Sequence, residues 1–228
     1  MNITFTNTIP FEIDPPQPAS KFIPEWYTNT DSYIGKNKKP DGNGGTTGTI
    51  KRCMPVFDAI TAGYIISSPA DVYVSLVDGY HYFEWASFNL ISLHSLEQAI
   101  EHPARNRQDV PVPKWENPWS IKTPKGYSTL FVQPFHRESV FTILPGIVDT
   151  DTYTAPINFP MIMNDPDFEG LIPKGTPIAQ VIPFRRDTWH MSLGSDKELK
   201  EQHSIRSKLN SKFFDRYKTM FWNKKEYR

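Results

Sequence analysis

The sequence predicts a mostly β protein with an extended N-terminal arm and a C-terminal amphipathic helix. Three observations support this fold class. Short apolar runs of strand character recur between about residues 50 and 190, and proline or glycine separates them. The 228 residues include 21 prolines and 12 glycines, which favours short elements with stiff connections. The last segment of the chain has the apolar spacing of a helix.

The N-terminal arm is predicted over residues 1–50. The stretch "DPPQP" forces extended backbone, and "KNKKPDGNGGTTG" is a polar loop without an apolar period. Three aromatic residues of the arm, Phe22, Trp26 and Tyr27, are too apolar to remain in water without a covering surface. We therefore predict that the arm docks, either on its own β domain or on another subunit.

A β domain is predicted over residues 51–194. Its clearest element is a hairpin, because residues 71–77 and 80–86 alternate around Asp78-Gly79, a dipeptide that favours a type I′ turn. Four further runs are expected to be strands: "GYSTLFVQP", "SVFTILPG", "INFPMIMN" and "TPIAQVIPF".

Two other stretches of the β domain are expected to differ from strands. A short helix is predicted at residues 93–101. The segment 102–124 carries five prolines, so it is predicted to cross the surface as an extended connection. Cys53 is the only cysteine, so no internal disulfide can form, and we interpret it as a small buried apolar residue.

The tail, residues 195–228, is predicted to be helical from about 196 to 222, with Ser195 or Asp196 as N-cap. Its apolar stripe consists of Leu199, Leu209, Phe213, Tyr217 and Met220. The tail has ten Lys or Arg against five Asp or Glu, net +5, and the remaining residues have net −5. We predict that the stripe, with Leu209 and Phe213 at its centre, docks on protein; binding of nucleic acid through the basic face is the alternative.

Three stretches of the sequence share features with one known family. In chain order they are "TAGYIISSPADVYV", "TPKGYSTLFVQPFHRES", and "GIVDTDTYTAPINFPMIMND" with the following "DFEGLIPKGTPIAQVIPF". Taken in this order, they resemble the trimeric dUTPase and dCTP deaminase group. The resemblance spans residues 60–185 and implies a distorted β-barrel, the β-clip, that forms trimers. More faintly, "IKRCMPVFDAITAGYII" and "IPEWY" resemble uncharacterised proteins of large tailed bacteriophages.

The resemblance also implies functional roles for particular residues. Asp149 would position or activate a water molecule, the aromatic ring of Tyr153 would pack on a deoxyribose, and the loop 135–139 would bind phosphates. The full set of candidate ligand-binding residues is Tyr64, Tyr127, His136, Arg137, Asp149, Asp151, Tyr153 and Gln180.

The sequence departs from that group at several of these positions. Ile65 and Met161 stand where acidic residues are expected, and Thr152 separates Asp151 from Tyr153. The tail lacks the glycine-rich segment with which dUTPases cover a triphosphate. These departures favour a fold that has lost its chemistry.

Structural interpretations compete with each functional one. Asp149 and Asp151 are also typical turn residues, and the tyrosines are also typical of a β core. Gln180 is expected to satisfy buried backbone groups, and His136 to lie on a surface loop.

The resulting prediction is a non-catalytic structural or interaction protein of a phage particle or phage-encoded assembly, located in the virion or the host cytoplasm. It is expected to form a homo-oligomer, with a trimer favoured, and to contact other phage structural proteins. The alternative is a nucleotide-directed enzyme, with Asp149 as its catalytic residue, or a nucleotide sensor. The histidines lack metal-ligand spacing and no run of about 18 apolar residues occurs, so neither a metal, a cofactor nor a membrane partner is expected. Magnesium would enter only with the enzyme alternative, and nucleic acid is not an expected partner.

Overall fold

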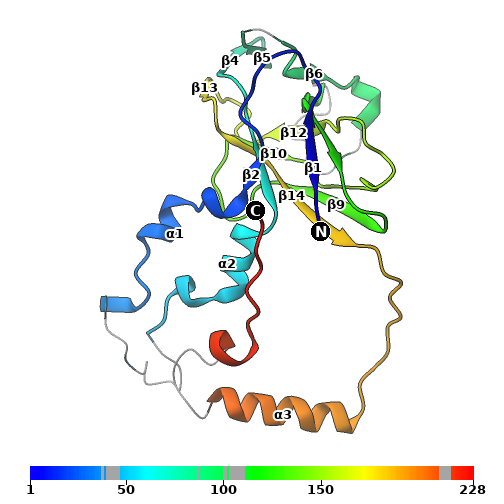
Figure 1. Ribbon diagram of the computed structural model, residues 1–228. Coiled ribbons are helices and arrows are strands. Elements are labelled where there is room, and N and C mark those ends of the chain that lie inside the picture. Colours follow the sequence, from blue (N-terminus) through cyan, green and yellow to red (C-terminus); the bar gives the residue numbers. More distant parts are fainter. Residues whose placement is uncertain (37–38, 40–46, 87, 100–101, 103–110, 211–216) are drawn as a thin grey trace. The chain divides into compact units, whose positions relative to one another are not determined.

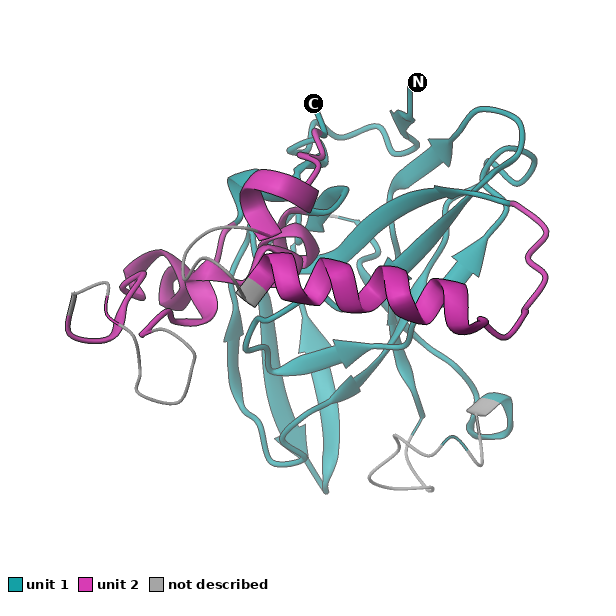
Figure 2. Ribbon diagram, turned by 90° about the horizontal axis from the view of Figure 1, so that it is seen from below, with its two compact units in different colours: residues 1–22, 62–186, 227–228 teal, residues 23–61, 187–226 magenta. Residues whose placement is uncertain are grey.

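The computed structural model describes residues 1–36, 39, 47–86, 88–99, 102, 111–210 and 217–228. As predicted, the fold is mostly β, with antiparallel sheets, few helices and a C-terminal helix (Figure 1). Among the described residues the strands form four separate sheets and do not close into one barrel. The chain divides into two compact units (Figure 2): residues 1–22, 62–186 and 227–228 form unit 1, and residues 23–61 and 187–226 form unit 2.

The largest sheet of unit 1 has five strands and contains the candidate site. In spatial order they are β11 (Gly146–Val148), β9 (Tyr127–Val132), β14 (Pro177–Arg185), β3 (Tyr64–Ser67) and β2 (Gln17–Pro18). β14 lies at the centre and pairs with both β9 and β3. Its four consecutive residues from Ile178 to Val181 are buried, as in a strand that is covered on both faces.

The second sheet of unit 1 includes a segment that the sequence analysis misinterpreted. Its strands are β10 (Phe141–Ile143), β12 (Phe159–Met163), β7 (Pro113–Trp115) and β6 (Ile91–Leu93). The prediction that 102–124 is a surface connection was wrong for its second half, because β7 and β8 (Trp119–Lys122) lie there and Trp115 and Ile121 are buried. Prolines are tolerated here because they stand at strand ends and between strands.

Two smaller sheets complete unit 1. β1 (Thr4–Asn7) pairs with β8, and β4 (Val72–Val77) pairs with β5 (Tyr80–Glu84) and β13 (Gly170–Ile172). The predicted hairpin is confirmed, since Val77 pairs with Tyr80 and both Asp78 and Gly79 have positive φ, 52° and 78°. The segment predicted as an arm therefore contributes strands β1 and β2 to unit 1.

The core of unit 1 is apolar and draws on both larger sheets. Strand β12 shows the alternation that produces it, because Phe159, Met161 and Met163 are buried and the two residues between them are only partly buried. Aromatic rings contribute much of the buried area, including Trp115 against Phe141 at 5.5 Å between ring centroids.

Unit 2 holds the helices. They are α1 (Glu25–Asn29), α2 (Met54–Thr61), α3 (Asp196–Asn210) and a π-helical turn (Tyr217–Phe221). Short 3₁₀ turns occur at Ile34–Lys36 and Ile50–Arg52 in unit 2 and at Ala19–Lys21 and Leu96–Ala99 in unit 1. In place of the helix predicted at 93–101, the described residues show the end of β6 and the 3₁₀ turn Leu96–Ala99.

Two aromatic side chains, Tyr27 and Trp222, make contacts within unit 2. Tyr27 is buried, stacks on Phe57 and donates a hydrogen bond to the carbonyl of Lys51, so its side chain is occupied within its own unit. The indole N–H of Trp222 lies 3.0 Å from both carboxylate oxygens of Asp58, which ties the C-terminal segment to α2.

The predicted tail helix is confirmed in its first half. Ser195 is the N-cap, with its hydroxyl accepting from the Lys197 amide and contacting Glu198 in a capping box. The stripe residues Leu199, Tyr217 and Met220 are exposed, and Phe213 lies outside the described residues. Among the described residues no helix has the length and apolar character required to cross a bilayer.

The interpretation of Cys53 as a buried residue was wrong, because the structure leaves this residue exposed between a 3₁₀ turn and α2.

Candidate functional site

Three neighbouring strands of the five-stranded sheet bring the candidate site together. Asp149 follows β11, Ser128 lies near the start of β9, and Arg186 follows the end of β14. Antiparallel register places these positions side by side, because Val148 pairs with Thr129 and Arg185 pairs with Tyr127. Residues that are 58 positions apart in the sequence, such as Ser128 and Arg186, therefore come into hydrogen-bond contact.

Asp151 is a structural carboxylate. It receives both guanidinium nitrogens of Arg186, with Nη1 at 2.8 Å from Oδ1 and Nη2 on Oδ2, and the Gly126 amide donates to Oδ2 at 2.8 Å. Its side chain is only 3% exposed. A bidentate pair with an additional backbone donor satisfies such a carboxylate fully and fixes the turn before β9.

Asp149 is held on one side only. Its Oδ1 accepts from the Ser128 hydroxyl at 2.6 Å and lies 2.9 Å from Nη1 of Arg186. Its side chain is 61% exposed, and within the described part of the chain its Oδ2 accepts no hydrogen bond. Asp149 therefore presents one oriented carboxylate oxygen to the exterior.

These contacts perturb the acidity of the three ionisable groups. Hydrogen bonds from Ser128 and then Arg186 hold the pKa of Asp149 below its usual value. Hydrogen bonds from Arg186 and the Gly126 amide lower the pKa of Asp151, and the bond to Asp151 raises the pKa of Arg186. Both carboxylates are thus stabilised as anions by the same guanidinium, and the lowered pKa makes Asp149 a weak base.

The backbone after Asp149 forms a tight turn that exposes an aromatic ring. The Asp149 carbonyl accepts from the amides of Thr152 and Tyr153, at 3.0 and 2.8 Å. Thr152, which the resemblance does not expect, takes part in this turn through its amide and its hydroxyl. The side chain of Tyr153 is 52% exposed and offers a flat apolar surface in the loop that carries Asp149.

Buried hydroxyls fix this loop from inside. Thr150 is fully buried, and its Oγ1 lies 2.8 Å from that of Thr123 and 2.7 Å from that of Thr129. The residue between the two aspartates is therefore anchored in the sheet, which restricts the position of both carboxylates.

Other predicted site residues have structural contacts. Gln180 is buried, donates to the Ala62 carbonyl at 2.7 Å and accepts from the Phe135 amide at 3.0 Å, so it satisfies buried backbone groups as expected. Tyr64 donates to the Arg228 carbonyl at 3.3 Å, and burial raises the pKa of Tyr64. Tyr127 lies at the start of β9 and is half-buried.

The loop predicted to bind phosphates contains one unsatisfied cation. His136 is exposed and has a φ of 55°. In Arg137 the Nη2 atom is buried and has no hydrogen-bond partner among the described residues, and burial lowers the pKa of this guanidinium. A buried guanidinium nitrogen without a protein partner takes its acceptor from water, an ion or a ligand.

Sequence reasoning missed the role of two residues in the cluster. No sequence pattern indicated a functional role for Ser128, because a serine within a run of strand character is common. Arg186 had a signal, since it follows a strand that ends in "IPFRR", yet its two carboxylate partners are 35 and 37 residues away and only the register identifies them. Within the described part of the chain no group of three or more His, Cys, Asp or Glu could hold a metal ion.

Comparison with known proteins gives matches among solved structures only. No protein-family model matches the sequence, and no curated protein matches it. The dUTPase of EIAV aligns at 14% identity and a TM-score of 0.32, covering 59% of this chain and 84% of that one. A mutant dUTPase of the Staphylococcus aureus phage phi11 aligns at 13% identity and a TM-score of 0.31, covering 58% and 82%.

A mutant dUTPase of Staphylococcus bacteriophage 80alpha aligns at 15% identity and a TM-score of 0.32, covering 58% of this chain and 75% of that one. Overlap as limited as this does not assign an activity to the chain.

Proposed function

We propose that the protein binds a nucleotide at the Asp149 cluster without hydrolysing or deaminating it. The observation that carries this proposal is that the two aspartates have different contacts and different exposure. Asp151 and Arg186 form a bidentate ion pair. Asp149 contacts the same guanidinium through Oδ1, and its Oδ2 is left available to a ligand.

The chemistry of the exposed groups fits a nucleoside. An oriented carboxylate oxygen accepts a hydrogen bond from a sugar hydroxyl, and the ring of Tyr153 offers a surface for the face of a sugar or base. Arg137 has a buried guanidinium nitrogen without a partner among the described residues, but its loop follows the end of β9 and Ser128 lies near the start of that strand, so Arg137 is not counted in the Asp149 cluster.

The surroundings of Asp149 disfavour catalysis. A general base is effective when its pKa lies near the working pH, and here hydrogen bonds lower the pKa of Asp149 from an already acidic value. Ile65 and Met161, which stand where the resemblance expects acids, are 1% and 0% exposed and form part of the core. No second carboxylate replaces them at those positions.

The test is a thermal melt of the purified protein with dUTP, dCTP, dUMP and deoxyuridine, each with magnesium. A ligand that binds only the native state raises the melting temperature by mass action. We expect a rise with at least one nucleotide, and unchanged nucleotide when the same mixtures are analysed by chromatography after incubation. Turnover that disappears in Asp149→Asn would instead identify an enzyme.

The variant Asp149→Asn distinguishes a role of Asp149 in ligand binding from a role in the stability of the loop. An asparagine keeps one oxygen for Ser128 and Arg186 and replaces the open acceptor by an NH₂ donor. We expect ligand affinity to fall about tenfold while the melting temperature without ligand changes little. The control Asp167→Asn, an exposed aspartate outside the cluster, should retain wild-type affinity; equal loss in both variants contradicts the proposal.

A second candidate function, a component of an assembly, is favoured by a separate observation. Trp189, Met191 and Leu193 alternate along the irregular segment after β14 and are 84%, 92% and 90% exposed. In an extended chain, alternate residues share one face, and an exposed apolar face of this kind marks an interaction surface. We propose that this face contacts other copies of the chain, with a trimer as the favoured oligomer, in a phage-encoded assembly.

A further inference from the structure

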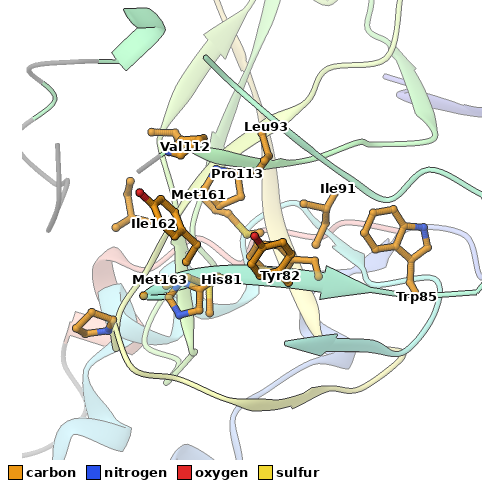
Figure 3. A pocket seen from close by; sticks show the side chains of 15 residues that line it. His81, Tyr82, Trp85, Ile91, Leu93, Val112, Pro113, Met161, Ile162 and Met163 are labelled. Carbon is orange, nitrogen blue, oxygen red and sulfur yellow. The ribbon is translucent and has the colours of Figure 1, made fainter. Parts of the chain in front are cut away.

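A cavity of about 440 Å³ lies in unit 1. Figure 3 shows side chains of strands β5, β6, β7 and β12 around it. None of the residues that line it takes part in the Asp149 cluster or in the loop 135–139. The cavity has the size of a site for a small organic molecule.

The lining is aromatic and aliphatic. It includes the rings of Tyr82, Phe83 and Trp85 from β5 and the segment after it, and the thioethers of Met161 and Met163 from β12. Among the described residues that line the cavity none is an Asp, Glu, Lys or Arg. A phosphate or carboxylate would therefore lose its hydration here without gaining a counter-charge.

Among the described lining residues, His81 carries a buried polar atom that lacks a partner. Its Nε2 atom is buried and makes no hydrogen bond within the described part of the chain. Burial lowers the pKa of His81, against the smaller opposing influence of Asp165 and Asp167, so the imidazole is neutral at neutral pH. A neutral imidazole nitrogen either donates or accepts one hydrogen bond, depending on its tautomer.

We propose that this cavity binds a small, uncharged, planar aromatic molecule that carries one hydroxyl group. The rings and thioethers contact the faces of the aromatic molecule, and its hydroxyl, which can donate or accept, satisfies Nε2 of His81 in either tautomer. The cavity shares no lining residue with the Asp149 cluster, so the proposal does not depend on the function proposed for Asp149.

The experiment compares two probes by isothermal titration calorimetry on the full chain. 2-Naphthol has the aromatic faces and the hydroxyl, and naphthalene has only the faces. We expect both to bind, with 2-naphthol bound roughly fivefold more tightly because of one hydrogen bond. In His81→Phe, which keeps a ring but removes the nitrogen, the affinity for 2-naphthol should fall to that for naphthalene.

A second pair of variants tests the location. Leu93 lines the cavity and is 56% exposed, so Leu93→Trp can fill the cavity without disturbing the core. We expect this variant to lose binding of both probes. The matched control Leu171→Trp adds the same side chain at an exposed position outside the cavity and should bind both probes as the wild type does.

Three outcomes would overturn the proposal. The first is failure of the wild type to bind either probe, and the second is unchanged binding in Leu93→Trp. The third is equal affinity of the wild type for the two probes, which would remove His81 and the hydroxyl group from the proposal. If the wild type binds neither probe, a lower oligomeric mass of Leu93→Trp in light scattering assigns the cavity to a contact between copies of the chain.

Discussion

Asp149 and Asp151 stand two positions apart, yet their environments give them different roles. Asp151 lies under Arg186 and has every oxygen bonded, whereas Asp149 shares one oxygen with Ser128 and Arg186 and keeps the other open. The intervening Thr150 fixes this difference, because its buried hydroxyl contacts anchor the loop in the sheet.

This arrangement predicts a pH-dependent contribution to stability. The pKa values of both carboxyls lie below their ordinary value of 3.8, so the folded state binds fewer protons than the unfolded state in acid. The contribution is complete above about pH 5 and is lost as the pH falls through the ordinary value and then the lowered folded values. The melting-temperature difference between wild type and Asp151→Asn should therefore be constant from about pH 7 to pH 5 and shrink below pH 4. A difference that grows on acidification would contradict the assignment.

Gly63 provides a second prediction at the residue scale. Its φ is +67°, and a Cβ atom added there would lie 1.9 Å from the carbonyl oxygen of Val181 on the neighbouring strand β14. Because the obstacle is backbone, no side-chain rotation relieves it. Gly63→Ala should lower the free energy of unfolding by about 2–4 kcal/mol in urea denaturation, while Gly146→Ala, which meets no atom within 4 Å, should cost less than about 1 kcal/mol.

The sequence predicted part of the candidate site at this scale. Asp149, Tyr153 and Arg137 were identified through the resemblance, and the structure gives each of them a distinct environment. The sequence could not show that Arg186 joins the two aspartates, because that contact depends on the pairing of β14 with β9. The exposure of Cys53 was also missed, since a lone cysteine is more often buried.

At the scale of elements, hairpin turns and alternating strands were predicted correctly and proline-rich stretches were not. Asp78-Gly79 fixes its hairpin locally, so sequence alone is sufficient. Strands β7 and β8 instead pair with strands that are far away in the sequence, β12 and β1. The prolines in and around them are more typical of a connection than of a strand, so the sequence pattern did not indicate them. The signal in the sequence was the presence of two tryptophans, Trp115 and Trp119, in one connection, because two large rings need a core; both are buried.

The C-terminal segment of unit 2 carries a prediction of its own. Trp222 donates to both oxygens of Asp58, and Lys225 lies 2.6 Å from one of them, so this carboxylate holds the segment on α2. Trp222→Phe keeps the apolar ring but removes the donor. We expect a loss of about 1–2 kcal/mol and faster hydrogen exchange of residues 217–226. Phe221→Leu, at an exposed neighbouring position, should leave the exchange rates unchanged.

At the scale of the whole molecule, the exposed apolar residues predict self-association. Trp26 is 39% exposed in the segment expected to dock, and Trp189, Met191 and Leu193 are far more exposed. We expect light scattering at micromolar concentration to give an oligomer, with a trimer as the favoured form. Replacing Trp189, Met191 and Leu193 by serine should shift the mass to that of the monomer. A monomeric mass for the wild type would contradict the prediction of self-association.

The exposed position of Cys53 makes the chain directly accessible to spectroscopy. Because it is the only thiol, a maleimide reagent attaches one spin label per chain, and the label is carried by unit 2. Ile147→Cys places a second label on unit 1 at a residue that is 64% exposed. Pulsed electron resonance between the two labels then measures how far apart the units stand in solution, and whether a nucleotide or 2-naphthol changes that separation.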